Sequence, residues 1–353
     1  EVVDKVKAFD AGGADYVTKP FQFGEVLARI ENQLRLQRLQ RDLEHRNADL
    51  LRMNEELREA QQREDRILHT LSDVLPGTML DGKYLLGEKL GSGGFGTVYR
   101  AVQTNLQRPV AVKILQRLAG RAHKEDLDRF RGEGISACRV NHPNALVVID
   151  SGVSSAGIAY LVMELLEGRT LAEEMVVDGP MSVARVAEVV LPVCDVLALA
   201  HAIGIVHRDI KPENIFLHRF AGAEVVKVLD FGLAKLLDAS VGMTLPGAVV
   251  GTPLYMAPER LIGNPHDTTA DIYAVGVMVY EMLTGRLPWD GDQWDMASLA
   301  TVRQNQDPIP LRELDSRFPV EVERVVMAAI DRNPDARPAA DQFARGIMES
   351  RNH

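Results

Sequence analysis

Two short polar motifs, separated by an apolar stretch, constrain this chain more than any other feature. HRDIKPEN occupies residues 207–214, and the strand-like stretch VVKVL then leads to Asp230 in the triplet DFG. In the first motif Asp209 is placed to accept a hydroxyl proton, Lys211 can neutralise a phosphate, and Asn214 can ligate Mg²⁺. Asp230 is expected to be the main metal ligand, because a hard cation that bridges phosphates prefers carboxylate oxygen. The two motifs together predict a site for phosphate chemistry with a metal ion.

A glycine-rich segment, GSGGFGTV at 91–98, lies between two predicted strands. Gly91, Gly93 and Gly96 would let the backbone approach a polyphosphate and direct N–H groups at its oxygens. A dinucleotide-binding turn is the main alternative, but such a turn leads into a helix, whereas TVYRAVQ reads as a strand. Glycines of an ordinary hairpin remain the second alternative.

Lys113 stands in the apolar run VAVKIL at 110–115. A lysine on a buried strand face requires an acidic partner or a ligand. Glu133, in the predicted helix RFRGEGISACRV, is the expected partner, and the pair would point Lys113 at phosphates. A lysine that reaches out to solvent is the alternative that this segment alone leaves open.

Taken in order, these motifs resemble those of a eukaryotic-type protein kinase, in the form common among bacterial serine/threonine kinases, over residues 84–349. The resemblance implies an α+β, two-lobed kinase fold with a β-rich N-lobe, a helical C-lobe and ATP between them. Mg²⁺ (or Mn²⁺) would be the metal. The use of Lys211 two residues after Asp209 is typical of serine/threonine kinases, and Thr252 supports the same interpretation, so protein Ser and Thr hydroxyls are the expected substrates.

The resemblance also implies a role for each matching residue. Asp209, Lys211, Asn214 and Lys113 would be catalytic, and Asn214 and Asp230 would hold the metal. The nucleotide would be bound by Gly91, Ser92, Gly93, Gly94, Phe95, Gly96, Val98, Ala111, Lys113, Glu133, Met163, Glu164 and Leu166, with Met163 as gatekeeper and 164–166 as the adenine-binding hinge. A pseudokinase that only binds and scaffolds is disfavoured, since no catalytic position departs from the pattern.

Structural and regulatory roles follow from the same resemblance. Glu259 is expected to pair with Arg337, Asp271 to hold the backbone of the catalytic loop, and His207 to be structural. Arg208 suggests activation by a phosphate in the loop that follows Asp230, because a phosphate can order a loop on an arginine. Ser240, Thr244 and Thr252 offer the hydroxyls, and Thr244 is the favoured one.

Composition limits the remaining classes. The 353 residues carry a net charge of −10, which argues against nucleic acid as the main partner. The two cysteines, Cys138 and Cys194, make no disulfide framework or zinc motif and suggest buried thiols in a reducing compartment. No apolar run reaches the ~18 residues of a membrane span, and 272–280 reads as a core helix. A cytoplasmic location is therefore expected.

The first 34 residues are predicted to be a separate piece. KVKAFDAGGADYVTKPF at 5–21 is similar to the last part of a response-regulator receiver domain, in which a Lys-Pro pair such as Lys19-Pro20 follows the final strand. The phosphorylated aspartate of such a domain would lie upstream of residue 1. The resemblance implies coupling to a two-component phosphorelay partner. A helix–strand–helix unrelated to receivers is the alternative.

A heptad pattern predicts a coiled-coil connector over residues 35–76. Its twelve seam positions are Leu36, Leu39, Leu43, Arg46, Leu50, Met53, Leu57, Ala60, Glu64, Ile67, Leu71 and Val74, and all but Arg46 and Glu64 are apolar. A homodimer through this seam is expected, with a helix packed on its own chain as the alternative. An oligomeric adaptor whose output is the coil remains a rival to the enzyme.

Overall fold

The structure is a computed structural model that describes residues 75–93, 96–115, 140–154, 158–231, 253–264, 267–291 and 296–350, with part of the segment 23–53. The chain divides into two compact units, Glu1–Val74 and Leu75–His353. Among the predicted features, the receiver-like segment 5–21, Gly94, Phe95, Glu133 and the hydroxyls at 240, 244 and 252 lie outside the described residues.

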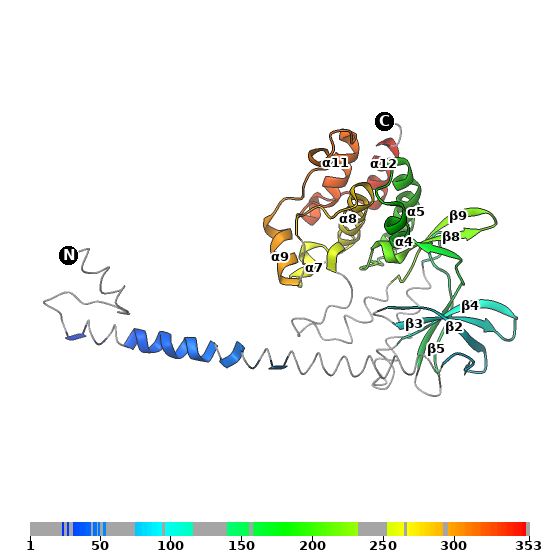
Figure 1. The fold of residues 1–353 in the computed structure, drawn as a ribbon, viewed down its shortest axis with the longest axis horizontal. Coiled ribbons are helices and arrows are strands. Elements are labelled where there is room, and N and C mark those ends of the chain that lie inside the picture. Colours follow the sequence, from blue (N-terminus) through cyan, green and yellow to red (C-terminus); the bar gives the residue numbers. More distant parts are fainter. Residues whose placement is uncertain are drawn as a thin grey trace. The chain divides into compact units, whose positions relative to one another are not determined.

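In the first unit, every described residue between 23 and 53 is helical (Figure 1). The predicted helix is therefore confirmed for that part. Its described seam side chains, Leu36, Leu39, Leu43 and Met53, are exposed, and Leu43 keeps 63% of its surface. Pairing of this helix with a second copy stays a prediction.

The second unit opens with a six-stranded antiparallel sheet. Its spatial order is β1-β2-β3-β4-β6-β5. The strands are β1 (Met79–Leu80), β2 (Tyr84–Gly93), β3 (Gly96–Gln103), β4 (Arg108–Ile114), β5 (Val148–Val153) and β6 (Ala159–Met163). The three strands predicted around the glycines and Lys113 are confirmed as β2, β3 and β4. The unit begins at Leu75, and its first strand, β1, pairs with β2.

The register divides this sheet into two faces. Val98 lies opposite Lys113, and Ala111 lies opposite Met163, so these four side chains share one face. The other face carries an apolar cluster that includes Tyr99, Val110, Val112, Tyr160 and Val162. Alternation along β4 thus explains why Lys113 lies within an apolar run and still faces away from the apolar cluster.

The rest of the unit is mainly helical and packs around α8 (Figure 1). Its helices are α4 (Leu171–Asp178), α5 (Val183–Ala202), α7 (Pro258–Leu261), α8 (Thr269–Thr284), α9 (Met296–Asn305), α10 (Leu311–Leu314), α11 (Val320–Ala329) and α12 (Ala340–Ser350). A small sheet of β7 (Gly168–Thr170), β8 (Ile215–Phe220) and β9 (Ala223–Val228) accompanies them. Residues 272–280 are buried within α8, which confirms the predicted core helix. The predicted two-lobed fold is confirmed.

Local sequence signals set the helix boundaries. The hydroxyl of Thr170 accepts the Glu173 N–H while Glu173 accepts the Thr170 N–H, so a capping box starts α4. Ser182 caps α5 by accepting the Arg185 N–H. Gly285 ends α8 in the left-handed conformation that glycine tolerates best.

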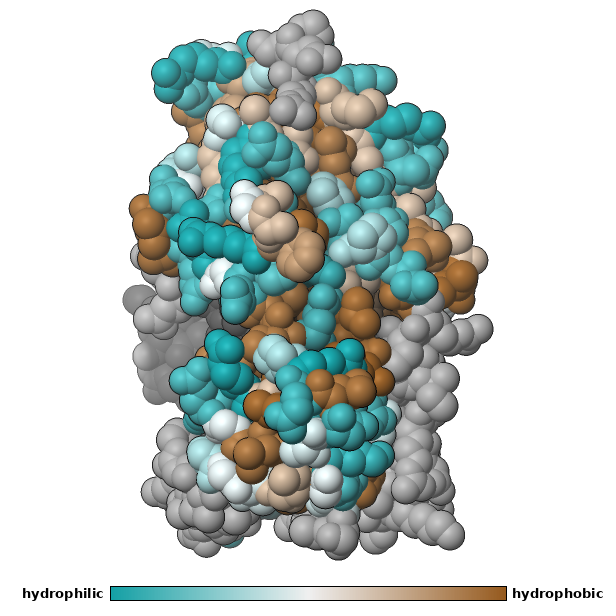
Figure 2. Space-filling model, turned by 90° about the vertical axis from the view of Figure 1, so that its right-hand side faces the viewer, coloured by the Kyte–Doolittle hydropathy of each residue, from teal (hydrophilic) through white to brown (hydrophobic). Residues whose placement is uncertain are grey.

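Hydrophilic side chains cover much of the face drawn in Figure 2, with hydrophobic residues between them. Such a mixed surface is expected even where many apolar side chains are buried in a core. Among the residues that the structure describes, no helix is long and apolar enough to span a bilayer.

Two glycines of the hairpin formed by β2 and β3, Gly91 and Gly96, differ in the space around them. Gly96 has φ +147°, and a Cβ placed on it would collide with the Ile114 carbonyl oxygen. Gly91 has nothing within 4 Å of the position of a Cβ. Of these two glycines, Gly96 is the one that the fold itself requires.

We expect Gly96→Ala to destabilise the protein by about 1–3 kcal/mol, because the strained backbone cannot move away from Ile114 without breaking the β3–β4 ladder. Gly91→Ala is the matched control and should leave the melting temperature nearly unchanged. Thermal unfolding of both variants measures the difference. Equal melting temperatures for the two variants would contradict the steric argument.

Candidate active site

The catalytic motif brings three predicted residues together at one carboxylate. Asp209 Oδ2 lies 2.9 Å from Lys211 Nζ and accepts a hydrogen bond of 2.8 Å from Asn214 Nδ2. Asn214 Nδ2 also donates to the Asp209 carbonyl at 2.7 Å. The short 3₁₀ helix Pro212–Asn214 turns the backbone so that Asn214 faces back to Asp209. A single oxygen of the Asp209 carboxylate thus contacts both the Lys211 ammonium group and the Asn214 side-chain amide.

A buried carboxylate, that of Asp271, holds the backbone of the catalytic motif in place. Asp271, 1% exposed at the start of α8, accepts hydrogen bonds of 2.8 Å from the backbone N–H groups of His207 and Arg208. His201 Nε2 lies 2.9 Å from the same carboxylate. Burial alone would raise the pKa of Asp271, but the hydrogen bond from His201 and the nearby histidines hold it below its usual range. The predicted role of Asp271 is confirmed.

His207 is fully buried within the same network. Its Nε2 lies 2.7 Å from the Leu229 carbonyl oxygen, its Nδ1 accepts the Asp209 N–H, and its ring meets Phe231 edge-on at 4.5 Å. These contacts agree with the structural role expected for it. They also join the catalytic loop to the segment that ends in Asp230.

Two residues of the site have left-handed backbones, Arg208 with φ +71° and Asp230 with φ +59°. Aspartate tolerates this region better than most residues do, whereas arginine does not. Such conformations cost of order 1–3 kcal/mol and persist where surrounding contacts over-determine them. For Arg208 those contacts include Asp271 at its N–H and Arg260 of α7 at its carbonyl.

One ion pair connects the two lobes. Lys113 Nζ of β4 lies 2.6 Å from Asp230 Oδ2, and both side chains are largely buried. Lys113 was predicted to pair with Glu133, which lies outside the described residues. The residue thus has an acidic partner, as its burial requires, and that partner is the predicted metal ligand.

The face of the sheet with Lys113 is lined as the resemblance implies, since Val98, Ala111 and Met163 lie beside it. Beyond Met163 the chain runs without secondary structure from Glu164 to Glu167. The Glu164 N–H is bonded to the Val147 carbonyl, and the Glu164 carboxylate accepts from Lys227 at 2.7 Å. Among the described residues, the Leu166 N–H has no hydrogen-bond partner. That amide is available to a ligand.

The described part of the glycine segment is a hairpin. Gly91 pairs with Val98, Ser92 with Thr97, and Gly93 with Gly96. The hydroxyls of Ser92 and Thr97 lie 3.4 Å apart. A hairpin excludes the dinucleotide-binding turn considered above, because no helix follows the glycines.

The oxygen atoms of Asn214 and Asp230 fit a hard cation. The Asn214 nitrogen is bonded to Asp209, which leaves its amide oxygen free of partners among the described residues. Lys113 contacts Oδ2 of the Asp230 carboxylate, so the other oxygen, Oδ1, can face a cation. These are the oxygen donors that Mg²⁺ prefers. No cluster of three or more His, Cys, Asp or Glu side chains suited to a metal occurs in the described parts of the chain.

The segment Pro253–Ala257, which we call the substrate-side loop, lies next to the catalytic motif. Its Tyr255, Met256 and Ala257 line the same small cavity as Asp209 and Lys211. Glu259, directly after it, forms a bidentate ion pair with Arg337 at 2.8 and 2.9 Å, as predicted. Tyr255 donates a 2.5 Å hydrogen bond to Glu281.

Sequence reasoning missed several partners of these residues: His201, Lys227, Glu281 and Arg303. None of them stands in a recognisable motif, and each meets its partner only through tertiary packing. Arg303 of α9 donates to the carbonyls of Leu254 and Met256 in the substrate-side loop. No signal in its neighbourhood, TVRQNQ, indicates this contact.

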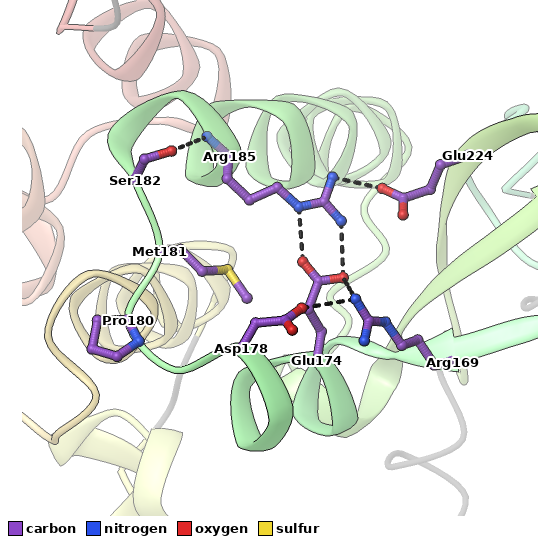
Figure 3. Close-up of a pocket in the computed structure, with 8 residues that line it drawn as sticks. All are labelled: Arg169, Glu174, Asp178, Pro180, Met181, Ser182, Arg185 and Glu224. Carbon is purple, nitrogen blue, oxygen red and sulfur yellow. Dashed lines mark hydrogen bonds and ion pairs between the residues drawn. The ribbon is translucent and has the colours of Figure 1, made fainter.

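A second cavity, of about 480 Å³, lies elsewhere in this unit (Figure 3). Arg169 and Arg185 converge there on the buried carboxylate of Glu174, and Arg185 also meets Glu224 at 2.7 Å. The charges that line this cavity are paired with one another. Their ion pairs join β7, α4, α5 and β9 to one another. None of the predicted site residues lines this cavity.

Comparisons with known proteins agree with this geometry. A family model described as "Protein kinase domain" matches residues 84–346. The serine/threonine-protein kinase pkn3 of Myxococcus xanthus is 36% identical over 285 residues, which are 79% of this chain and 52% of that protein. PknL of Mycobacterium tuberculosis is 39% identical over 276 residues, 78% of this chain and 66% of that protein. The chain thus spans about half to two thirds of the length of these relatives.

Among solved structures, the kinase domain of PknI from Mycobacterium tuberculosis superposes with a TM-score of 0.61 at 25% identity, covering 78% of this chain and 98% of that one. The fold, the order of the motifs and the sequence relatives give one result. The chain belongs to the protein kinase family, through a domain that the family model places at residues 84–346.

Proposed function

We propose that this chain is an active serine/threonine protein kinase, which transfers the γ-phosphoryl group of ATP to Ser and Thr hydroxyls of proteins. The observation that carries the proposal is the arrangement at Asp209, where Lys211 and Asn214 both contact one carboxylate oxygen. The Lys113–Asp230 pair supports it from the other lobe. The serine/threonine activity in the names of the relatives favours the same acceptor, as does Lys211.

Each residue has a role in the proposed transfer. Asp209 orients the acceptor hydroxyl and takes its proton as the oxygen attacks the γ-phosphorus and ADP leaves. Lys211 offsets the negative charge of the transferred group. The oxygens of Asn214 and Asp230 would hold Mg²⁺, which would neutralise negative charge at the phosphates.

Nucleotide binding would use the groups on the face of the large sheet that carries Lys113. Val98, Ala111 and Met163 would pack on adenine, and the Leu166 N–H would donate to it. The glycine hairpin, from Gly91 through Ser92, Gly93, Gly94 and Phe95 to Gly96, would cover the phosphates. Lys113 would contact phosphate with Glu133 as a further partner.

We also propose an upstream input. A receiver domain, of which residues 1–34 would be the end, would pass a two-component signal through the helix to the kinase, in the cytoplasm where ATP is available. Pairing of the helix with a second copy is supported by the row of exposed leucines on its described part, including Leu36, Leu39 and Leu43. Burial of one such side chain is worth roughly 1.5–3 kcal/mol before entropic costs, so pairing of two copies is favoured. A dimer would raise the effective concentration of one kinase domain for the other.

Asp209→Asn should lower phosphoryl transfer by roughly 10²-fold or more, because the base is lost while the nucleotide site is intact. Asp230→Asn should weaken binding of Mg-ATP as well, since it removes a metal ligand. Transfer from labelled ATP and equilibrium binding of a fluorescent ATP analogue separate the two effects. Asp195→Asn, at an exposed position of α5, is the control and should behave as wild type. Substantial transfer by the Asp209 variant would contradict the assignment, and an inactive wild type that binds ATP would favour the pseudokinase.

Replacing Leu39 and Leu43 with Glu should convert a dimer into a monomer, because two charges would enter the apolar seam. The control carries Gln37→Glu and His45→Glu, which add the same charge outside the seam. Sedimentation equilibrium of the whole chain at micromolar concentration measures the effect. A monomeric wild type, or equal dissociation by both double variants, would refute the coiled-coil dimer and favour packing on the same chain.

A further inference from the structure

Arg303 of α9 is one of the most deeply buried side chains described, with 1% of its surface exposed. Its guanidinium faces the substrate-side loop. Nη1 donates to the Met256 carbonyl at 2.8 Å, and Nη2 donates to the Leu254 carbonyl. Nη1 also lies 3.2 Å from the Tyr273 hydroxyl of α8. One planar group therefore bridges two backbone carbonyls of the substrate-side loop, whose first part is a short 3₁₀ helix (Pro253–Tyr255), and a core helix.

The surroundings of this cation are unusual, because no carboxylate pairs with it among the residues that the structure describes. Its charge is met by carbonyl oxygens and by two aromatic rings instead. The guanidinium carbon lies 4.5 Å from the centre of the Trp289 ring and 5.5 Å from that of Tyr273, and the two rings are stacked. Aromatic faces and carbonyl dipoles both stabilise a cation where water is excluded. Burial nevertheless lowers the pKa of Arg303.

Stability of the fold alone does not account for an arginine here. Burying a charge is costly unless it is well paired, and apolar residues of similar volume often serve a core equally well. The Arg303 Nε is also without a partner among the described residues. What an apolar side chain could not supply is the pair of parallel donors that fixes the carbonyls of Leu254 and Met256.

The position of those carbonyls matters because of what lies beside them. Tyr255, Met256 and Ala257 border the same small cavity as Asp209 and Lys211. The loop is anchored at further points by the Tyr255–Glu281 hydrogen bond and the Glu259–Arg337 ion pair. Of these anchors, Arg303 alone reaches the backbone of the loop at two points.

We propose that Arg303 is a positioning residue for the protein substrate: by holding the carbonyls of Leu254 and Met256, it sets the loop against which the polypeptide around the target hydroxyl lies. This inference rests on the proposed kinase function. Arg303 acts through the loop and touches neither nucleotide nor metal. It should therefore affect the protein acceptor and leave ATP unaffected.

The test compares Arg303→Met with wild type in the full chain, with myelin basic protein as the acceptor. We expect the KM for the acceptor to rise by roughly tenfold, the effect of losing about one hydrogen bond to a charged group, while the KM for ATP stays within about twofold. Arg303→Lys keeps the charge but not the two-pronged geometry, and should recover only part of the loss. It also provides the measurement if the Met variant does not fold.

Arg185→Met is the matched control, because it removes a partly buried arginine from the ion-pair network of Figure 3 in the same lobe. Its melting temperature should fall, with both KM values close to wild type. The proposal is overturned if the Arg303 variants keep the wild-type KM for the acceptor, or if both KM values change in proportion. A wild type that transfers no phosphate to any acceptor would instead refute the proposed function, and this inference with it.

Discussion

The arrangement of the site depends on one buried carboxylate. Asp271 accepts the two successive N–H groups of His207 and Arg208, and the backbone at Arg208, directly before Asp209, has a left-handed conformation. That conformation directs Asp209 toward Lys211 and Asn214. Because Asp271 begins α8, the most buried helix of the large lobe, the geometry of the catalytic motif is fixed by the core.

The second constraint is the register of the large sheet. Pairing of β3 with β4 and of β4 with β6 gathers Val98, Ala111, Lys113 and Met163 on one face, while the apolar cluster forms on the other. Since side chains alternate along each strand, a shift by a single residue would exchange the two faces. The cluster around Tyr99 and Tyr160 therefore keeps Lys113 directed toward Asp230.

Three of the buried charged groups in the large lobe differ in how their charge is compensated. Arg337 has a bidentate carboxylate partner in Glu259, and Glu174 has two arginines. Arg303 has carbonyl oxygens and aromatic rings. The first two resemble structural ties, since each joins segments distant in sequence with its charge neutralised. The third holds two carbonyls of the substrate-side loop against α8, which is why we assign it a role in substrate positioning.

The sequence by itself determined the fold class, the order of the site motifs and the set of candidate site residues, because each motif combines chemistry with local spacing that few other structures require. Asp209, Lys211 and Asn214 lie within the short segment 209–214, so the local backbone is enough to bring their side chains together. The partnership of Glu259 with Arg337 followed from family resemblance. Tertiary structure alone decided the observed contact of Lys113 with Asp230, 117 residues away, the addition of β1 to the sheet, and the place of Arg303 under the substrate-side loop. Such contacts depend on how helices and strands pack in three dimensions, and neither hydrophobic periodicity nor a motif specifies which distant side chain fills a given space.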